Sequence, residues 1–78
     1  MKLTLLTPQG AVLDAEVDSV ILPGTEGEMT VLPSHASLIA TLKKGKLRYF
    51  QSSKKSESAE IEKGWVEVFK DRVLVLTS

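Results

Sequence analysis

The sequence predicts a single all-β domain over residues 1–78, folded as a sandwich or barrel of short strands. Three observations support this fold class. Apolar and β-branched residues occur in runs short enough for strands, turn residues such as Pro and Gly interrupt these runs at close intervals, and several runs alternate apolar with charged side chains. The chain shows no internal repeat, linker or second domain. It has no Cys, so its core must close by apolar burial alone.

The first predicted strand covers residues 2–7 and places Leu3 and Leu5 on one face. The sequence Thr-Pro-Gln-Gly at residues 7–10 suits a type I turn, with Pro second and Gly fourth. The next run, residues 17–22, is apolar on both faces, as in a strand that is covered on two sides.

Pro23-Gly24 follows this run and has the pattern of a type II turn in which Gly24 takes a positive φ. The segment from Ser34 to Lys44 is ambiguous. It could form a short helix capped by Ser34 and ended by Gly45, or a strand, and periodicity alone does not decide between them.

The second half of the chain contains further strand patterns. Residues 60–62 and 67–70 alternate apolar with charged side chains, and residues 72–76 are rich in Val and Leu. On a strand over residues 46–50, one face would carry Lys46, Arg48 and Phe50, and the other Leu47 and Tyr49.

The net charge is zero, but the charges are unevenly distributed. Residues 1–42 contain one base and five acids, a balance of −4, whereas residues 43–78 contain nine bases and five acids, a balance of +4. This asymmetry predicts two differently charged surfaces, which bears on partners more than on fold. The composition excludes a disordered chain, and no apolar run approaches the length of a membrane span. No signal peptide is recognisable, so we expect a small soluble intracellular domain.

The chain offers little for catalysis. His35 is the only imidazole, and without Cys a metal site would lack most of its usual ligands. Neither a phosphate-binding Gly-rich loop ending in Lys-Ser/Thr nor a Gly-x-Ser-x-Gly elbow is present. We therefore expect no catalytic residues, no metal and no cofactor, with His35 serving in a turn or an interface.

Two charged segments could bind partners. The stretch 43–55 contains six bases and no acid. Arg48 and Phe50, with the flanking lysines, could form a surface that binds single-stranded nucleic acid. The loop 23–28, Pro-Gly-Thr-Glu-Gly-Glu, is either a solvated loop or a protruding recognition loop of negative charge. Composition leaves both questions open.

The run from Leu22 to Gly45 reads LPGTEGEMTVLPSHASLIATLKKG and closely resembles the signature of the F-type ATP synthase epsilon subunit, which is called delta in mitochondria. Residues that match this signature in register are Gly24, Glu26, Gly27, Glu28, Pro33, His35, Ala36, Leu38, Thr41, Lys43 and Gly45. The opening strand and the final Val- and Leu-rich hairpin are also similar, so the resemblance spans nearly the whole chain.

The sequence departs from the signature at a few positions. Thr30 and Ser34 replace Gly, which puts in doubt any loop geometry that needs a positive φ there, and Ser37 replaces Pro. Family members commonly continue into two C-terminal helices that bind ATP or inhibit hydrolysis in some of them. The resemblance does not reach that hairpin, so neither property is carried over, and whether the chain is naturally short stays open.

The resemblance implies a flattened sandwich of about ten short strands in two sheets, without the helical hairpin, and it makes residues 37–42 a strand. It also implies a non-catalytic rotor subunit that links subunit gamma to the c-subunit ring, monomeric when isolated and peripheral to the cytoplasmic face of a bacterial inner membrane. No nucleic acid is an expected partner. The residues expected to contact gamma or the ring, by match to the family, are Glu26, Gly27, Glu28, His35 and Leu38.

Overall fold

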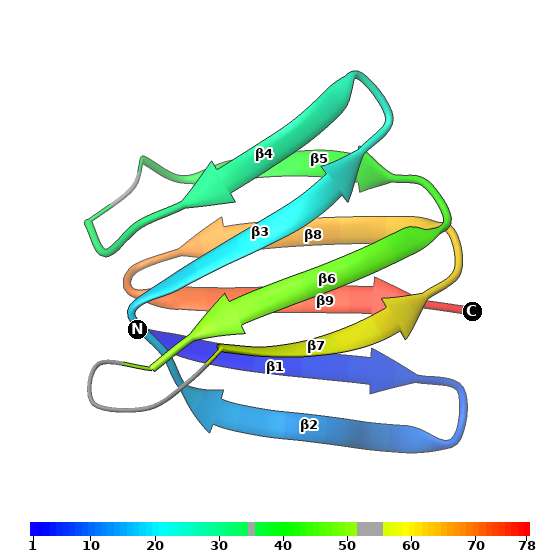
Figure 1. Ribbon diagram of the computed structural model, residues 1–78, viewed down its shortest axis with the longest axis horizontal. Coiled ribbons are helices and arrows are strands. Elements are labelled where there is room, and N and C mark those ends of the chain that lie inside the picture. Colours follow the sequence, from blue (N-terminus) through cyan, green and yellow to red (C-terminus); the bar gives the residue numbers. More distant parts are fainter. Residues whose placement is uncertain (35, 52–55) are drawn as a thin grey trace.

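The computed structural model describes residues 1–34, 36–51 and 56–78, and within these ranges the chain is all strand (Figure 1). This confirms the predicted fold class, with nine strands where about ten were expected. Their bounds are β1 (Lys2–Thr7), β2 (Gly10–Glu16), β3 (Ser19–Gly24), β4 (Gly27–Val31), β5 (Leu38–Leu42), β6 (Gly45–Phe50), β7 (Ser56–Ile61), β8 (Gly64–Phe69) and β9 (Arg72–Thr77).

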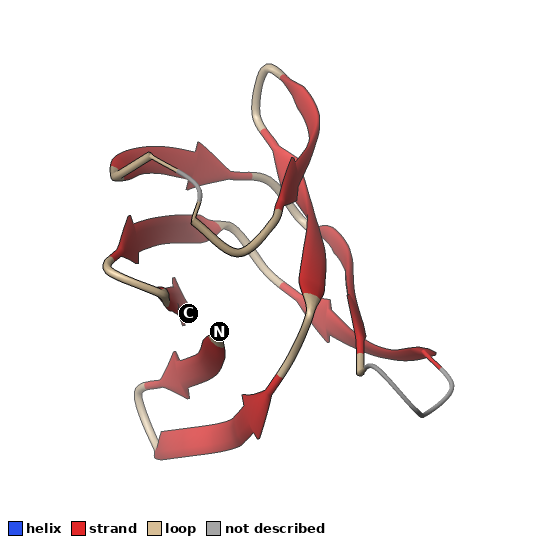
Figure 2. Ribbon diagram, turned by 90° about the vertical axis from the view of Figure 1, so that its left-hand side faces the viewer, coloured by secondary structure: helices blue, strands red, loops and turns tan. Residues whose placement is uncertain are grey.

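The strands form one continuous curled sheet that folds over into two layers (Figure 2). One layer has the order β2-β1-β9-β8-β5, and the other contains β4, β3, β6 and β7. The layers are joined where β3 meets β5, at the single residue pair Gly24 and Leu42. Only the β1–β9 ladder is parallel among the described pairs, and it places the first strand beside the last.

The core lies between the layers and consists of one apolar cluster. Leu3 and Leu5 of β1 lie on one face, as predicted, and this face points into the core beside the buried valines of β9. Among the described residues no polar or charged side chain is fully buried. The buried residues are Met1, Leu3, Leu5, Val17, Val20, Leu22, Val31, Leu42, Leu47, Ile61, Val66, Val68, Val73 and Val75.

The sequence predicts that the run 17–22 is buried on both faces, but the structure buries only one face fully. Along β3, fully buried residues alternate with half-buried ones, because only one face of this strand is covered by the opposite layer. The strand predicted over 46–50 is confirmed with its faces, since Leu47 is buried while Lys46 and Arg48 are exposed.

The predicted type II turn at Pro23-Gly24 is wrong. Gly24 ends β3 and pairs with Gly27, which is the glycine with the positive φ, 129°. A glycine is still required at position 24, because a Cβ there would lie 2.6 Å from the carbonyl oxygen of Gly27. The turn therefore comes two residues later than predicted and consists of Thr25 and Glu26.

Within the ambiguous segment from Ser34 to Lys44, Leu38–Leu42 form a strand, β5, in agreement with the strand that the family resemblance implies over residues 37–42. Ser34 precedes this strand with a φ of 68°, in the left-handed region that favours glycine. The loop thus has at position 34 the conformation for which the family uses Gly, although the residue here is Ser.

The β8–β9 hairpin brings two backbones unusually close. Its two-residue loop has positive φ at both Lys70 (44°) and Asp71 (64°), the pattern of a type I′ turn. At the other end of the hairpin, a Cβ on Gly64 would collide with the carbonyl oxygen of Leu76. Gly64 is therefore required by backbone contact.

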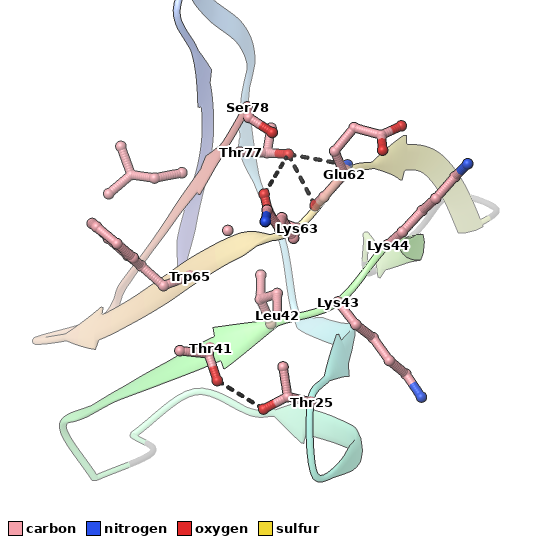
Figure 3. A pocket seen from close by; sticks show the side chains of 12 residues that line it. Thr25, Thr41, Leu42, Lys43, Lys44, Glu62, Lys63, Trp65, Thr77 and Ser78 are labelled. Carbon is pink, nitrogen blue, oxygen red and sulfur yellow. Dashed lines mark hydrogen bonds between the residues drawn. The ribbon is translucent and has the colours of Figure 1, made fainter.

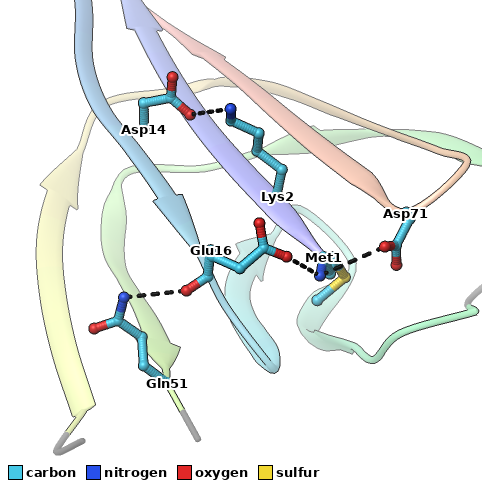
Figure 4. Close-up of polar contacts among 6 residues, drawn as sticks. All are labelled: Met1, Lys2, Asp14, Glu16, Gln51 and Asp71. Carbon is cyan, nitrogen blue, oxygen red and sulfur yellow. Dashed lines mark hydrogen bonds and ion pairs between the residues drawn. The ribbon is translucent and has the colours of Figure 1, made fainter.

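The amino terminus is fixed by charge as well as by the burial of the Met1 side chain (Figure 4). The Met1 ammonium lies 2.7 Å from a carboxylate oxygen of Glu16 on β2 and 3.6 Å from Asp71 in the β8–β9 turn. The bond to Met1 lowers the pKa of Glu16, and the same bond raises the pKa of the ammonium. This contact joins β1, β2 and the β8–β9 turn.

The described residues contain no helix that could cross a bilayer.

Candidate partner-binding site

The acidic loop forms the tip of the β3–β4 hairpin, and it projects from one corner of the molecule (Figure 1). Gly24 and Gly27 close the two-residue turn, so Thr25 and Glu26 stand at its apex. Thr25, Glu26, Gly27 and Glu28 are all exposed. The structure thus brings three of the five expected site residues together on one protruding turn.

The hairpin tip is held against β5 by hydrogen bonds (Figure 3). The Thr25 amide donates to the carbonyl of Thr41 at 3.1 Å, and the hydroxyls of the two threonines lie 2.7 Å apart. The Lys43 amide also donates to the carbonyl of Pro23 at 2.9 Å. The tip is therefore presented in a defined position relative to β5, which reduces the entropy lost when a partner binds.

Glu28 and Glu26 differ in their ion pairing. One oxygen of Glu28 accepts a hydrogen bond from the Arg48 guanidinium at 3.1 Å across β3, and both side chains are largely exposed. Such an exposed pair contributes about 0.2–1 kcal/mol. The acidic and basic halves of the sequence meet at this pair. Within the described residues Glu26 makes no ion pair, so its charge is available to a partner.

Leu38 is not part of the acidic turn. Leu38 begins β5, pairs with Val68 and is half-buried against the core, so its side chain supports the fold. His35 lies outside the described residues.

A shallow hollow lies beside the contact between Thr25 and Thr41, between the β3–β4 hairpin and β5, and it is lined by a residue that the sequence did not single out. Ile39 projects outward from β5 and is 74% exposed, next to two half-buried neighbours on the strand. Strand alternation could have identified it, but only once the segment was known to be a strand. No base lines the hollow, whose described residues are Gly24, Thr25, Glu26, Gly27, Glu28, Met29, Ile39, Ala40 and Thr41.

A second groove lies on the outer side of β5, β8 and β9 (Figure 3). Trp65, which is 53% exposed, and Leu76 belong to its apolar part, and Lys43, Lys44 and Lys63 are also among the residues that line it. The hydroxyl of Thr77 accepts a hydrogen bond from the Glu62 amide and donates one to the Glu62 carbonyl, which fixes the end of β9 beside this groove.

Among the described residues of the basic stretch, Arg48 and Phe50 do not form the surface that the nucleic-acid alternative requires. Arg48 is engaged by Glu28, and both rings of β6, Tyr49 and Phe50, are partly buried. Stacking of single-stranded bases needs exposed aromatic faces beside free cations. Lys54 and Lys55 lie outside the described residues. Among the described residues no group of three or more metal-ligating side chains is assembled.

Comparison with known proteins gives one consistent result. The profile of the family "ATP synthase, Delta/Epsilon chain, beta-sandwich domain" matches residues 1–78. The chain is 41% identical over 76 residues to the ATP synthase epsilon chain of Campylobacter concisus, covering 97% of this chain and 59% of that one. It is 42% identical over 76 residues to the epsilon chain of Chlorobium limicola, covering 97% of this chain and 86% of that one.

Two solved structures have the same fold. A chain in the mitochondrial ATP synthase of Euglena gracilis, solved as OSCP, F1 and c-ring, superposes with a TM-score of 0.89 at 28% identity, over 96% of this chain and 48% of that one. A chain of the Tetrahymena thermophila mitochondrial ATP synthase, solved as central stalk and c-ring, gives a TM-score of 0.81 at 18% identity, over 99% of this chain and 62% of that one. The second likeness shows the fold alone. The alternative of a nucleic-acid-binding barrel receives no support from either comparison.

Proposed function

Because the chain belongs to the ATP synthase delta/epsilon family through its β-sandwich domain, we propose that it is a non-catalytic subunit of the rotor of a proton-translocating ATP synthase. In this role it links subunit gamma to the c-subunit ring and helps to couple rotation to ATP synthesis. The chain spans 59% of the Campylobacter relative that it matches, so the proposal concerns the β domain.

The observation that supports this role best is the acidic hairpin tip, which matches the family signature and is held rigidly at a corner of the domain. Glu26, Gly27 and Glu28 present their polar groups outward from a turn that is tied to β5 through Thr25 and Thr41. A subunit that transmits torque needs such a fixed contact, since a flexible loop would bend under load.

We assign Glu26 and Glu28 to the loops of the c-ring, which carry Arg and Gln in the family. Charge-assisted hydrogen bonds to these loops would set the orientation of the domain more than its affinity. Glu28 would exchange its bond to Arg48 for one to the ring. That exchange costs little, because the internal pair is exposed. His35 and Leu38 belong to the same contact region by match to the family.

In this role the domain is an accessory part of the enzyme and contributes no catalytic residue, metal or cofactor. It would be monomeric when isolated and would lie at the cytoplasmic face of a bacterial inner membrane only through the assembled complex.

The test is assembly with purified gamma and c-ring, followed by proton pumping in reconstituted vesicles. Wild-type chain is expected to bind gamma and the ring together. Glu26→Lys combined with Glu28→Lys is expected to weaken pumping without unfolding the domain, as judged by an unchanged denaturant midpoint. Glu57→Lys, which reverses an exposed acid on β7, is the control and is expected to pump normally. Unchanged pumping by the double variant would refute the assignment of the acidic tip.

A further inference from the structure

A second hollow on the β3–β4 hairpin is basic, and it lies where the turn between β5 and β6 approaches β3. Four of the described residues that line it are bases, namely Lys43, Lys44, Lys46 and Arg48. Glu28 is the one acid among them, and it already binds Arg48 at 3.1 Å. Four bases against one acid give this basic hollow a net charge of +3.

The three lysines of the basic hollow are free to bind an anion. All three are exposed, and none forms an ion pair with another residue of the described chain. Glu60 lies opposite Lys46 in the β6–β7 ladder, but the two side chains form no ion pair. The charge of the hollow therefore comes from Lys43, Lys44 and Lys46, because Arg48 is neutralised by its own carboxylate partner.

The backbone holds these lysines in one place. The Lys43 amide donates a hydrogen bond to the carbonyl of Pro23 at 2.9 Å. At Gly45 an added Cβ would lie 3.0 Å from the Cβ of Pro23, so the turn packs closely against β3. Three flexible ammonium groups thus extend from a fixed turn, an arrangement suited to phosphate groups whose own positions vary.

The surroundings of the basic hollow favour one source of phosphate. No aromatic side chain is among its described lining residues, so the bases of a single-stranded nucleic acid would find nothing to stack on. Glu28 lines both this hollow and the shallow hollow beside the acidic tip, and the tip and the basic turn lie at the same end of the molecule (Figure 1). A domain whose acidic tip rests on a c-ring would hold this turn near the phospholipid headgroups that surround the ring.

We propose that Lys43, Lys44 and Lys46 bind the phosphate groups of anionic phospholipids at the membrane surface beside the c-ring. The attraction acts within about one Debye length, roughly 8 Å at physiological salt, so it operates once the ring has positioned the domain. It inserts no apolar group into the bilayer, so the domain can pass over the headgroups as the ring turns. This inference rests on the proposed function.

Sedimentation with lipid vesicles tests the proposal. At about 20 mM salt the chain is expected to bind vesicles of phosphatidylglycerol and to leave vesicles of phosphatidylcholine, which carry no net charge, unbound. Combining Lys43→Gln, Lys44→Gln and Lys46→Gln should weaken binding by about fivefold per lysine, or about a hundredfold in all. Failure of the wild-type chain to bind the anionic vesicles would overturn the proposal.

A matched variant at the opposite end of the molecule distinguishes the basic hollow from overall charge. Lys2, Lys70 and Arg72 are also exposed bases, at the start of β1 and in the β8–β9 hairpin (Figure 1). Replacing all three with Gln removes the same charge and should leave most of the vesicle binding intact. Equal losses in the two triple variants, with unchanged denaturant midpoints, would overturn the assignment to the hollow.

Competition identifies the source of the phosphate. Neither inorganic phosphate nor a single-stranded oligonucleotide, added at constant ionic strength, is expected to displace the chain from anionic vesicles. Displacement by either would overturn the choice of lipid.

Assembly with purified gamma and c-ring in detergent separates this inference from the proposed function. The variant that lacks the three lysines of the basic hollow should still assemble, because its acidic tip is intact. Loss of assembly in that variant would show that these lysines bind a protein and not lipid. Failure of the wild-type chain to assemble would refute the proposed function, and the placement of lipid beside the ring would fail with it.

Discussion

The hydroxyl groups of Thr25 and Thr41 lie 2.7 Å apart and fasten the tip of the β3–β4 hairpin to β5, with the Thr25 amide adding a second bond to the Thr41 carbonyl. Two threonines from different strands thus hold the most prominent turn of the domain in place. Because the contact lies at the surface, its main effect is to limit the motion of the turn.

Replacing Thr41 with Val removes one hydroxyl and keeps the β-branched shape. We expect a loss of about 0.5–1.5 kcal/mol in the free energy of unfolding and faster exchange of the Thr25 amide. Urea titration and amide exchange measure these two effects. Thr30→Val, at an exposed position of β4, is the control and should leave both quantities nearly unchanged. Equal effects of the two substitutions would show that the hydroxyl pair does not hold the turn.

Ser34 adopts a φ of 68°, which a residue with a Cβ reaches only at a cost. Ser34→Gly is therefore expected to raise the free energy of unfolding by about 0.5–1 kcal/mol. Ser58→Gly in β7 is the matched control and should lower stability instead, because no positive φ is needed within that strand. Thermal and chemical unfolding of the two variants distinguish these outcomes. Destabilisation by both would mean that position 34 is not strained.

Gly64 tolerates no side chain, because its Cβ would collide with the carbonyl of Leu76 inside the β8–β9 ladder. We expect Gly64→Ala to destabilise the domain by about 3 kcal/mol or more, which is sufficient to unfold much of it. Gly10→Ala provides a comparison, because a Cβ at that position meets nothing within 4 Å and only the positive φ is strained. A cost no larger at position 64 than at position 10 would contradict the close approach of the two strands.

The contact between Met1 and Glu16 predicts a pH window of stability. The pKa of Glu16 is lowered from 4.5, so its contribution is present above that value and is lost as the pH falls through the lowered pKa. The pKa of the Met1 ammonium is raised from 8.0, so its contribution is present below that value and is lost as the pH rises through the raised pKa. Stability from this contact is therefore greatest between about 4.5 and 8.0.

Urea midpoints measured across pH test this window. Glu16→Gln should flatten the profile at both ends relative to wild type. Asp18→Asn removes an exposed acid that makes no ion pair among the described residues, and its profile should retain the shape of the wild-type profile. If the Glu16→Gln variant has the same pH profile of stability as the wild type, the contact does not form in solution.

Strands with strict alternation were predictable because a strand that covers a core on one side has a period of two. Alternation puts Leu3 and Leu5 on one face of their strand and separates Leu47 from Lys46 and Arg48, and all three leucines are buried. The segment from Ser34 to Lys44 could not be assigned locally. Its strand state depends on pairing with β8, which is distant in the sequence, so local propensity carries too little information.

Within the site, the charged turn is recognisable from the sequence, and the family resemblance adds its expected contact with a partner. Two features are not predictable in this way. Pro23-Gly24 has a strong local turn pattern, yet β3 continues through it because Gly24 must approach Gly27 and pair with Leu42. Ile39 was overlooked because an apolar residue in an apolar run is normally assigned to the core. Its exposure depends on which face of β5 the opposite layer covers.

The parallel pairing of β1 with β9 also determines when the domain can form during synthesis. β9 lies inside its layer, between the first strand and β8, and not at an edge. Until residues 72–77 have left the ribosome, β1 and β8 have no common neighbour and the buried valines of β9 are absent from the core. Contacts between such distant parts of the sequence fold slowly. The domain therefore gains a stable structure only after β9 has been synthesised and can insert between β1 and β8.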